Sequence, residues 1–282
     1  MIRCVPSSIV GFFIMAKSAG ICVFCGERRP LTKSHILPAW ISTILSFPAT
    51  HYEMRVGMPQ TFVPTATRPQ PESLKKPGHA AGRQPRNTCL ECNSGWMRRI
   101  EEAARPVITP LLLGQPVLLE PIAQRLLASF LCLVAMRIEF SARGVRTIPQ
   151  SHIVQLMATM QASEGWQIWI ARYSPKNKPD NLFNYSAILL ARQPPPVILP
   201  QHCNAQTSTI AVGQFCAHIF STTIPQDIKY NVPLSLIWPP ANFAIDVSHV
   251  PLLDRAQLIW LSEAILRQGR PVPGNEVQTR TK

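Results

Sequence analysis

Two Cys-x-x-Cys pairs are the residues of this chain best suited to chemistry. The first is Cys22-Val23-Phe24-Cys25 and the second is Cys89-Leu90-Glu91-Cys92. Four thiolates can occupy the corners of a tetrahedron, which is the arrangement that a structural Zn²⁺ ion requires. A single pair would fit a turn with incidental thiols or a redox pair equally well. Two pairs beside turn-forming residues favour one shared zinc ion that is structural and does not touch substrate.

A histidine and an asparagine accompany the two pairs. His35 lies in Ser34-His35-Ile36-Leu37-Pro38, and Asn93 directly follows the second pair. A neutral imidazole can take a proton from water near pH 7, and an amide oxygen can coordinate a hard divalent cation. Each residue also has a plainer interpretation, since most single histidines are merely packed or exposed and an asparagine at this position can cap a helix.

Taken together, the two motifs resemble the HNH endonuclease family, in the branch written C-x-x-C … (S/E)-H-I-x-P-x-W … C-x-x-C-N-x-G-W-M … E. The resemblance covers roughly residues 20–112. It implies a zinc-stabilised ββα-metal module in which His35 is the general base and Asn93 is a ligand of a catalytic Mg²⁺ or Mn²⁺ ion. The position before the base often holds Asp, Glu or His in this family. Here it is Ser34, a weaker ligand, so weaker binding of that ion is expected.

Two further residues become relevant through the resemblance. Asn87, just before the second pair, fits the middle asparagine that orients the base, or it is an ordinary loop asparagine. Glu101 either binds or orients the divalent ion, or it is an exposed helix glutamate. Trp40 and Trp96 are expected to pack the small core of the zinc module rather than to stack on bases.

The elements around these residues are expected to be short. The sequence predicts a strand or knuckle at the first pair, a turn at 27–30 and a short helix over 39–45. A longer helix is predicted over 93–105, with Asn93 or Ser94 as its N-cap and Pro106 ending or bending it. Residues 47–86 show no clear period and include a basic, proline-rich segment. We therefore predict a loop insertion there, with weakly strand-like pieces at 51–56 and 60–66.

From residue 116 to about 266 the pattern predicts a C-terminal α+β domain with long helices and a small sheet. Apolar residues recur at helical spacing over 122–141, and further helices are predicted over 150–163 and 254–266. Strand-like runs of alternating or β-branched residues are found at 166–173, 185–191, 207–221 and 234–238. This part of the sequence indicates no chemistry of its own.

The chain as a whole is therefore predicted to be α+β, with the zinc module over 20–115 and a polar tail over 267–282. Residues 1–19 are treated as an N-terminal extension. Their apolar run fits a signal-peptide outline, but a start at Met15 or a poorly ordered extension fits as well.

The composition favours a polyanionic partner. The 282 residues are 46% hydrophobic and 15% charged, enough for a sizeable core, and the net charge is +13. Residues 26–105 contain 12 Lys and Arg against 6 Asp and Glu. We expect DNA to bind a basic surface around 68–105. The candidate phosphate contacts are Lys75, Lys76, Arg83, Arg86, Arg98 and Arg99.

The other cysteines indicate a reducing compartment. Cys4, Cys132, Cys203 and Cys216 are scattered, and two of them lie in apolar surroundings typical of buried thiols. Zinc thiolates and free thiols persist in the cytoplasm, which is the expected location. No membrane association is expected, because the apolar run 126–136 is bracketed by Arg125 and Arg137.

Three hypotheses follow. The first is a metal-dependent HNH endonuclease that hydrolyses phosphodiester bonds of DNA. The alternative is a non-catalytic, zinc-stabilised nucleic-acid-binding protein that kept the scaffold after losing a ligand at Ser34. The third is a structural zinc module that serves protein contacts through the apolar second half.

Overall fold

The computed structural model describes residues 19–45, 51–61, 72–77, 84–141, 146–174, 182–189, 203–223 and 233–262, with backbone alone over 51–61 and 72–77. The alternatives for the N-terminal extension and the prediction of a polar tail lie outside these residues. The fold is a mixture of helices and sheets, so the α+β class is confirmed.

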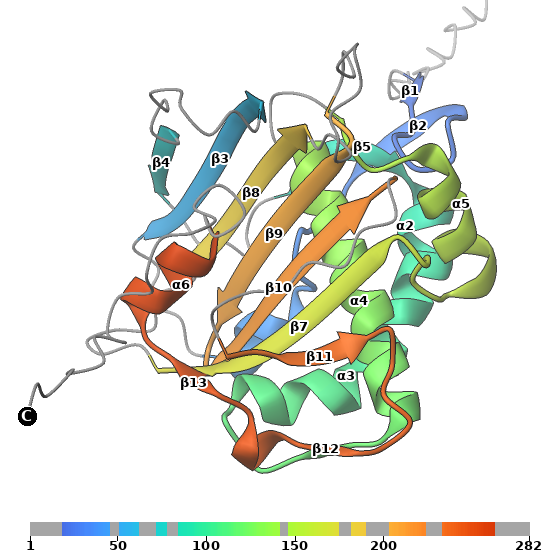
Figure 1. Ribbon diagram of the computed structural model, residues 1–282. Coiled ribbons are helices and arrows are strands. Elements are labelled where there is room, and N and C mark those ends of the chain that lie inside the picture. Colours follow the sequence, from blue (N-terminus) through green and yellow to red (C-terminus); the bar gives the residue numbers. More distant parts are fainter. Residues whose placement is uncertain are drawn as a thin grey trace, which may run out of the picture.

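An eight-stranded sheet forms the centre of the molecule (Figure 1). Its strand order is β11-β7-β10-β9-β8-β3-β4, with β13 beside β7. Neighbouring strands are antiparallel except for two parallel pairs, β3 with β8 and β13 with β7. The strands are β3 (His51–Thr61), β4 (Glu72–Pro77), β7 (Trp166–Tyr173), β8 (Leu182–Leu189), β9 (Ala205–Val212), β10 (Phe215–Thr222), β11 (Ser235–Trp238) and β13 (Leu252–Leu253).

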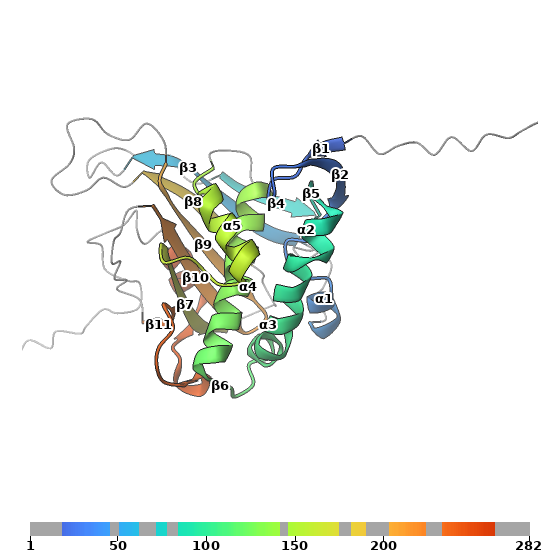
Figure 2. The ribbon, with the colours of Figure 1, turned by 90° about the vertical axis from the view of Figure 1, so that its right-hand side faces the viewer.

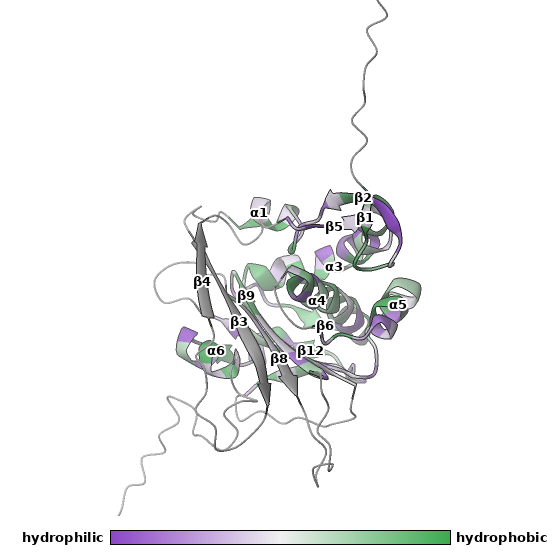
Figure 3. Cartoon of the chain, turned by 90° about the horizontal axis from the view of Figure 1, so that it is seen from above, coloured by the Kyte–Doolittle hydropathy of each residue, from purple (hydrophilic) through white to green (hydrophobic). Residues whose placement is uncertain are grey.

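Helix α4 (Pro121–Ser141) is the core helix. It lies between the sheet and α3 (Trp96–Leu112), as Figure 3 shows from above, and α5 (Gln150–Thr159) lies beside it. The short helix α6 (Arg255–Ser262) covers the other face of the sheet. By length and composition α4 could cross a membrane, but 72% of its most apolar window is buried inside the fold. A helix that is apolar all round is typical of such a buried position.

The smaller elements complete the frame. Strand β6 (Leu118–Leu119) pairs with β12 (Ile245–Asp246) near the start of α4, and the short 3-10 helix η2 (Val247–His249) follows β12. The N-terminal module contains β1 (Ala19–Ile21), β2 (Arg28–Lys33), α1 (Trp40–Ile44), β5 (Arg86–Cys89) and α2 (Leu90–Ser94). Its strands form a separate sheet in the order β1-β2-β5. Figure 2 shows the strands of this module above α3, close to the end of α4, and α1 beside α3.

The module is fixed to the end of α4 by aromatic packing. The ring of Phe24, which lies between the first two cysteines, meets Phe140 of α4 edge-on at 4.9 Å and Trp96 of α3 at 5.9 Å. The side chain of Gln150 donates to the carbonyl oxygen of Phe24 at 2.7 Å. One hydrophobic core contains residues of both predicted domains. The boundary at 115 and 116 stays a prediction.

A buried carboxylate holds the same end of α4 from the other side. Glu139 is 2% exposed and accepts hydrogen bonds from the hydroxyls of Thr147 and Tyr185, at 2.6 and 2.8 Å. The backbone N–H groups of Thr147 and Ile148 also donate to it. A buried carboxylate needs such donors. They tie the segment after α4, and strand β8, to the helix that carries the module.

Several predicted elements are confirmed, among them α4, α5, β7 and the short helix α1. The predicted loop insertion over 47–86 is wrong in part, because β3 and β4 form there. These two strands extend the central sheet, which is therefore larger than the small sheet predicted. The pieces expected at 51–56 and 60–66 became one strand over 51–61. The turn expected at 27–30 is instead the start of β2.

The helix predicted over 93–105 is two helices. α2 starts at Leu90, and α3 then runs from Trp96 to Leu112 through Pro106 and Pro110. A proline removes one backbone hydrogen bond from a helix. Pro106 is exposed, whereas Ile108 and its apolar neighbours in the next turn are buried. The packing of that apolar face outweighs the lost bond, so the helix does not end at Pro106.

Candidate metal centre and the His35 segment

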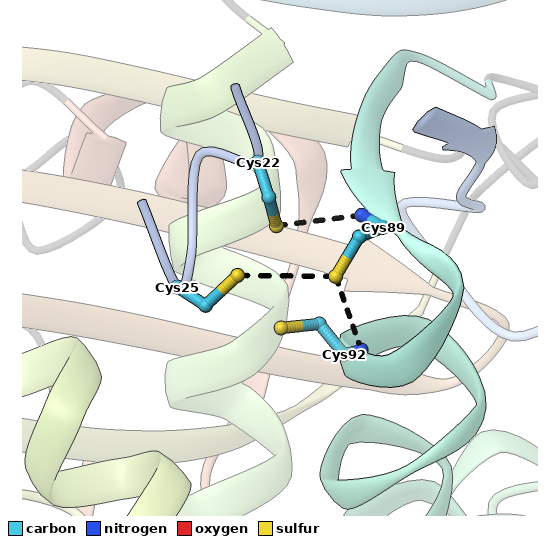
Figure 4. Close-up of side chains that lie close together, drawn as sticks. All are labelled: Cys22, Cys25, Cys89 and Cys92. Carbon is cyan, nitrogen blue, oxygen red and sulfur yellow. Dashed lines mark hydrogen bonds between the residues drawn. The ribbon is translucent and has the colours of Figure 1, made fainter. Parts of the chain in front are cut away.

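The four paired cysteines meet in one cluster (Figure 4). Their sulfur atoms all lie within 4.8 Å of one another, and Cys25 Sγ is 3.8 Å from Cys89 Sγ. A tetrahedral zinc site with Zn–S bonds of about 2.3 Å has sulfur–sulfur edges of about 3.8 Å. The described cysteines are all free, so the cluster is not a pair of disulfides. Cys22, Cys25, Cys89 and Cys92 could therefore hold a metal ion such as zinc.

Local backbone geometry brings the two pairs together. The first pair lies on a tight turn in which Gly26 has φ +76°, a conformation that favours glycine, and its N–H donates to Cys22 O at 2.9 Å. The second pair opens a helix, because Cys89 is the N-cap of α2 and its sulfur accepts from Cys92 N at 3.5 Å. The neighbouring backbone N–H of Cys89 donates to Cys22 Sγ at 3.3 Å. The second pair thus directs two backbone N–H groups at sulfur atoms of the cluster.

These donors affect the protonation of the thiols. Burial by itself raises the pKa of Cys22. The backbone N–H groups of Cys25, Cys89 and Phe24 lower it by more, so the net pKa is below its usual value. Burial raises the pKa of Cys89 and Cys92 above the usual value. A bound cation stabilises the thiolate form of its ligands. A positive ion at the centre of the cluster would therefore favour the thiolate form of the four residues.

Trp96 supplies a further donor beside the cluster. Its indole N–H is buried and has no hydrogen-bond partner that meets the usual geometry. Burial raises the pKa of Cys92, and the indole N–H of Trp96 acts in the opposite direction. Buried donors are costly when unpaired. A thiolate at Cys92 would give this N–H the charged acceptor it lacks, and the donor set therefore fits a metal ion. The expectation that Trp96 packs the module is confirmed, since it is 5% exposed.

Asn93 links the second knuckle to the histidine segment. Its Oδ1 accepts a hydrogen bond from Ser34 Oγ at 3.0 Å, and its Nδ2 donates to Lys33 O at 3.4 Å. Ser34 is 2% exposed. Asn93 and Ser94 both lie inside α2, whose N-cap is Cys89, and the N-cap of α3 is Gly95. This corrects the expectation that Asn93 or Ser94 caps the longer helix. The amide of Asn93 is therefore free to hold the segment just before His35.

His35 follows these two residues and is half-buried. Its Nε2 lies 2.6 Å from Nε2 of the exposed Gln84. In this orientation Gln84 donates and the imidazole proton is on Nδ1, an assignment that follows from the hydrogen bond. Burial lowers the pKa of His35 and the positive charge of Arg137 lowers it further, while Glu101 acts in the opposite direction. The imidazole is therefore favoured in its neutral form.

The hydrogen bonds of the Asn87 side chain are made to residues other than His35, and its role in orienting the base stays a prediction. Its Nδ2 donates to Phe140 O at 3.2 Å, near the end of α4, and its Oδ1 accepts from Thr88 Oγ1 at 3.0 Å. The last carbonyl groups of a helix lack partners within the helix. Asn87 satisfies one of them. Its role in the structure is to join β5 to α4.

Glu101 forms a buried ion pair with Arg137. Arg137 Nη1 lies 2.5 Å from Glu101 Oε1, and the two side chains are 4% and 18% exposed. Nη2 of Arg137 lies 3.6 Å from the sulfur of Met97, and its Nε has no partner. The expectation that Glu101 binds a divalent ion stays a prediction, but one of its oxygens is already occupied. The alternative of a merely exposed glutamate is wrong, because the carboxylate lies between α3 and α4.

We expect Arg137→Met to lower the free energy of unfolding by about 3–5 kcal/mol, because it leaves a carboxylate without its buried partner. Urea unfolding measures the change. In the double variant Glu101→Leu, Arg137→Met no charge is left unpaired, so most of the loss should be recovered.

The exposed pair of Arg98 and Glu102 on α3 is the matched control. Their side chains are 66% and 59% exposed. Arg98→Ala should shift the urea midpoint much less than Arg137→Met does, because the pair is in solvent. If Arg137→Met shifts the midpoint no more than Arg98→Ala, or if the double variant is as unstable as the single one, the buried pair does not have the role assigned to it.

The remaining candidates are distributed as follows. Arg105 lies over the ring of the half-buried Trp40 at 5.3 Å. Arg83 and the side chains of Lys75 and Lys76 lie outside the described residues. Cys132 and Cys216 are buried thiols as expected, and Cys203 is half-buried.

Sequence reasoning missed Gln84 and the pairing role of Arg137. A signal for Arg137 was present, because it falls one turn after Leu133 on the apolar stripe of the predicted helix. A charged residue on a buried stripe requires a partner. No such signal identifies Gln84.

Comparison of the chain with protein-family models, with curated proteins and with solved structures finds no match.

Proposed function

We propose that this protein is a metal-dependent endonuclease of HNH type that hydrolyses phosphodiester bonds of DNA, with His35 as the general base. One observation carries the proposal: the two cysteine knuckles meet, and α2 then presents Asn93 to the segment Lys33-Ser34 immediately before His35. The antiparallel strand pair β2 and β5, followed by α2, is the arrangement expected of a ββα-metal module. The zinc ion would be held by the four cysteines and would take no part in the reaction.

The residues of the chain can perform two tasks in such a reaction. His35 is half-buried with its ring held by an exposed glutamine, so water or substrate can replace Gln84 at Nε2 and give up a proton there. Ser34 Oγ and Asn93 Oδ1 lie 3.0 Å apart and are the two hard oxygens that would hold Mg²⁺ or Mn²⁺. When bound, that ion neutralises charge on the scissile phosphate.

Net charge supports a nucleic-acid substrate. The whole chain carries +13. Lys33 and Arg86 of the module and Arg99 of α3 are exposed and have no acidic partner among the described residues. A polyanion is attracted to such a surface in a salt-dependent manner.

A plasmid-nicking assay tests the proposal. Purified protein that retains its zinc is incubated with supercoiled plasmid in Mg²⁺ or Mn²⁺, and open-circular and linear products are followed over time. We expect nicking that depends on the added ion and stops when that ion is withdrawn. Absence of nicking under both ions, with intact zinc content, would exclude the hydrolytic function.

A second candidate, the non-catalytic nucleic-acid-binding protein, is favoured by one specific contact. The hydroxyl of Ser34 donates to Asn93 Oδ1, so the two candidate ligand oxygens satisfy each other and no carboxylate lies at the position of Ser34. This candidate predicts salt-sensitive DNA binding without turnover. The nicking assay and a binding titration on the same preparation separate the two functions.

A further inference from the structure

Two basic side chains face each other across the strand pair β2 and β5, next to His35. In the β2–β5 ladder, Lys33 pairs directly with Arg86. Both are exposed, and neither has an ion pair with a described acidic residue. Side chains directly opposite in an antiparallel pair lie about 5 Å apart, and like charges there destabilise the sheet. Fold stability therefore gives no reason for this pair.

A bulge sets the register between β2 and β5 at this point. Thr32 pairs with Thr88 but Lys33 pairs with Arg86, so Asn87 is the extra residue of β5. Its side chain is the one that donates to Phe140 O of α4. Bulges redirect the side chains that follow them and are frequent beside active sites. Without this extra residue Lys33 would face Asn87 instead of a second cation.

The register continues as far as His35. Ser34 N donates to Pro85 O at 3.0 Å, which places His35 opposite Gln84, and these two side chains are in contact at 2.6 Å. Residues two apart on a strand share a face. One face of this strand pair and its extension therefore carries Lys33, His35, Gln84 and Arg86. Ser34, between Lys33 and His35, faces Asn93.

We propose that Lys33 and Arg86 bind the DNA backbone next to the phosphate that His35 serves. This inference rests on the proposed function and names its substrate-binding residues. Two adjacent cations on paired β-strands suit a phosphodiester chain, whose negative charges recur along the DNA strand. Contacts of this kind position a substrate without reading its sequence. The like-charge repulsion is relieved only when an anion lies between them.

The double variant Lys33→Gln, Arg86→Gln tests the pair. Binding of a blunt DNA duplex is titrated at several salt concentrations. Because each phosphate contact contributes about 0.9 to the slope of log K against log salt, we expect the slope to become shallower by about 2. The melting temperature should be unchanged or higher, since the repulsion is gone, and zinc content should not change.

The control Arg28→Gln, Arg125→Gln removes the same charge. Arg28 lies on β2 but on the alternate face, and Arg125 lies near the start of α4, at the end remote from β2 (Figure 2). Its slope should change by less than half as much as that of the test variant.

Each outcome decides one point. A wild-type protein that binds and nicks DNA, with equal slopes in the test variant and wild type, overturns the role of the pair but leaves the nuclease in place. A protein that binds without nicking, with the slope change present, supports the pair and excludes hydrolysis. A wild type that binds no DNA at low salt overturns both.

Discussion

Cys92→Ser should remove the zinc ion and much of the stability of the protein. The wild type should contain about one Zn²⁺ per chain, and the variant should retain only a small fraction of it after dialysis. Structural zinc contributes its binding free energy to folding. Serine leaves three thiolates around the buried centre. We expect a loss of about 3–5 kcal/mol, or about 10 °C in Tm.

The loss should extend beyond the module. Phe24, between Cys22 and Cys25, packs on Phe140 at the end of α4, and Asn87 donates to the carbonyl oxygen of the same residue. Hydrogen exchange should therefore show faster opening at the end of α4 as well as in β2 and β5.

Cys203→Ser is the matched control, because Cys203 is a half-buried free thiol outside the cluster. It should leave the zinc content unchanged and cost less than about 1 kcal/mol. If Cys92→Ser retained a full zinc ion as tightly as the wild type, the ligand set described for the cluster would be incorrect.

His35→Ala should abolish metal-dependent nicking while leaving zinc content and Tm close to those of the wild type. General-base catalysis contributes about 10²–10⁴-fold in rate, and the variant should lose an amount in this range. The imidazole is half-buried and forms a hydrogen bond with the exposed Gln84. Its removal should therefore disturb the fold little. Nicking rates and zinc content are measured on the same preparation.

His249→Ala is the control for this experiment. His249 is an exposed histidine on η2, with its ring 85% exposed and paired to Asp246. It should nick plasmid at the wild-type rate. Equal nicking by His35→Ala and His249→Ala would remove His35 from the mechanism and would point to a contaminating nuclease or to another base.

The cysteine cluster was predictable because its signal is local. The two Cys-x-x-Cys pairs have the residue types and spacing that a tetrahedral site demands, whatever the rest of the chain does. The same holds for α4, whose apolar residues recur at helical spacing, and for β7, where large apolar residues alternate. In these places the local pattern and the tertiary structure agree.

The errors arose where distant parts of the chain decide the structure. Strand β3 carries little periodicity, and it forms by parallel pairing with β8, far later in the sequence. Parallel pairing cannot be read from one segment alone. Helix α2 starts early because the sulfur of Cys89 caps it, and the propensity rules name Ser, Thr, Asp and Asn for that role.

The His35 site was predictable in part. Asn93 is linked through Ser34 and Lys33 to the segment before His35, and its role as a ligand of a divalent ion stays a prediction. The pairing of Lys33 with Arg86 depends on a one-residue bulge at Asn87. A bulge of this kind changes the register of every following pair, and no residue type in the sequence announces it.

X-ray absorption at the zinc edge of the purified protein tests the central claim most directly, namely that Cys22, Cys25, Cys89 and Cys92 bind one ion together. The account predicts one zinc per chain with four sulfur neighbours at about 2.3 Å. A first shell with nitrogen or oxygen in place of sulfur, or a protein that folds fully with disulfides and no zinc, would contradict it.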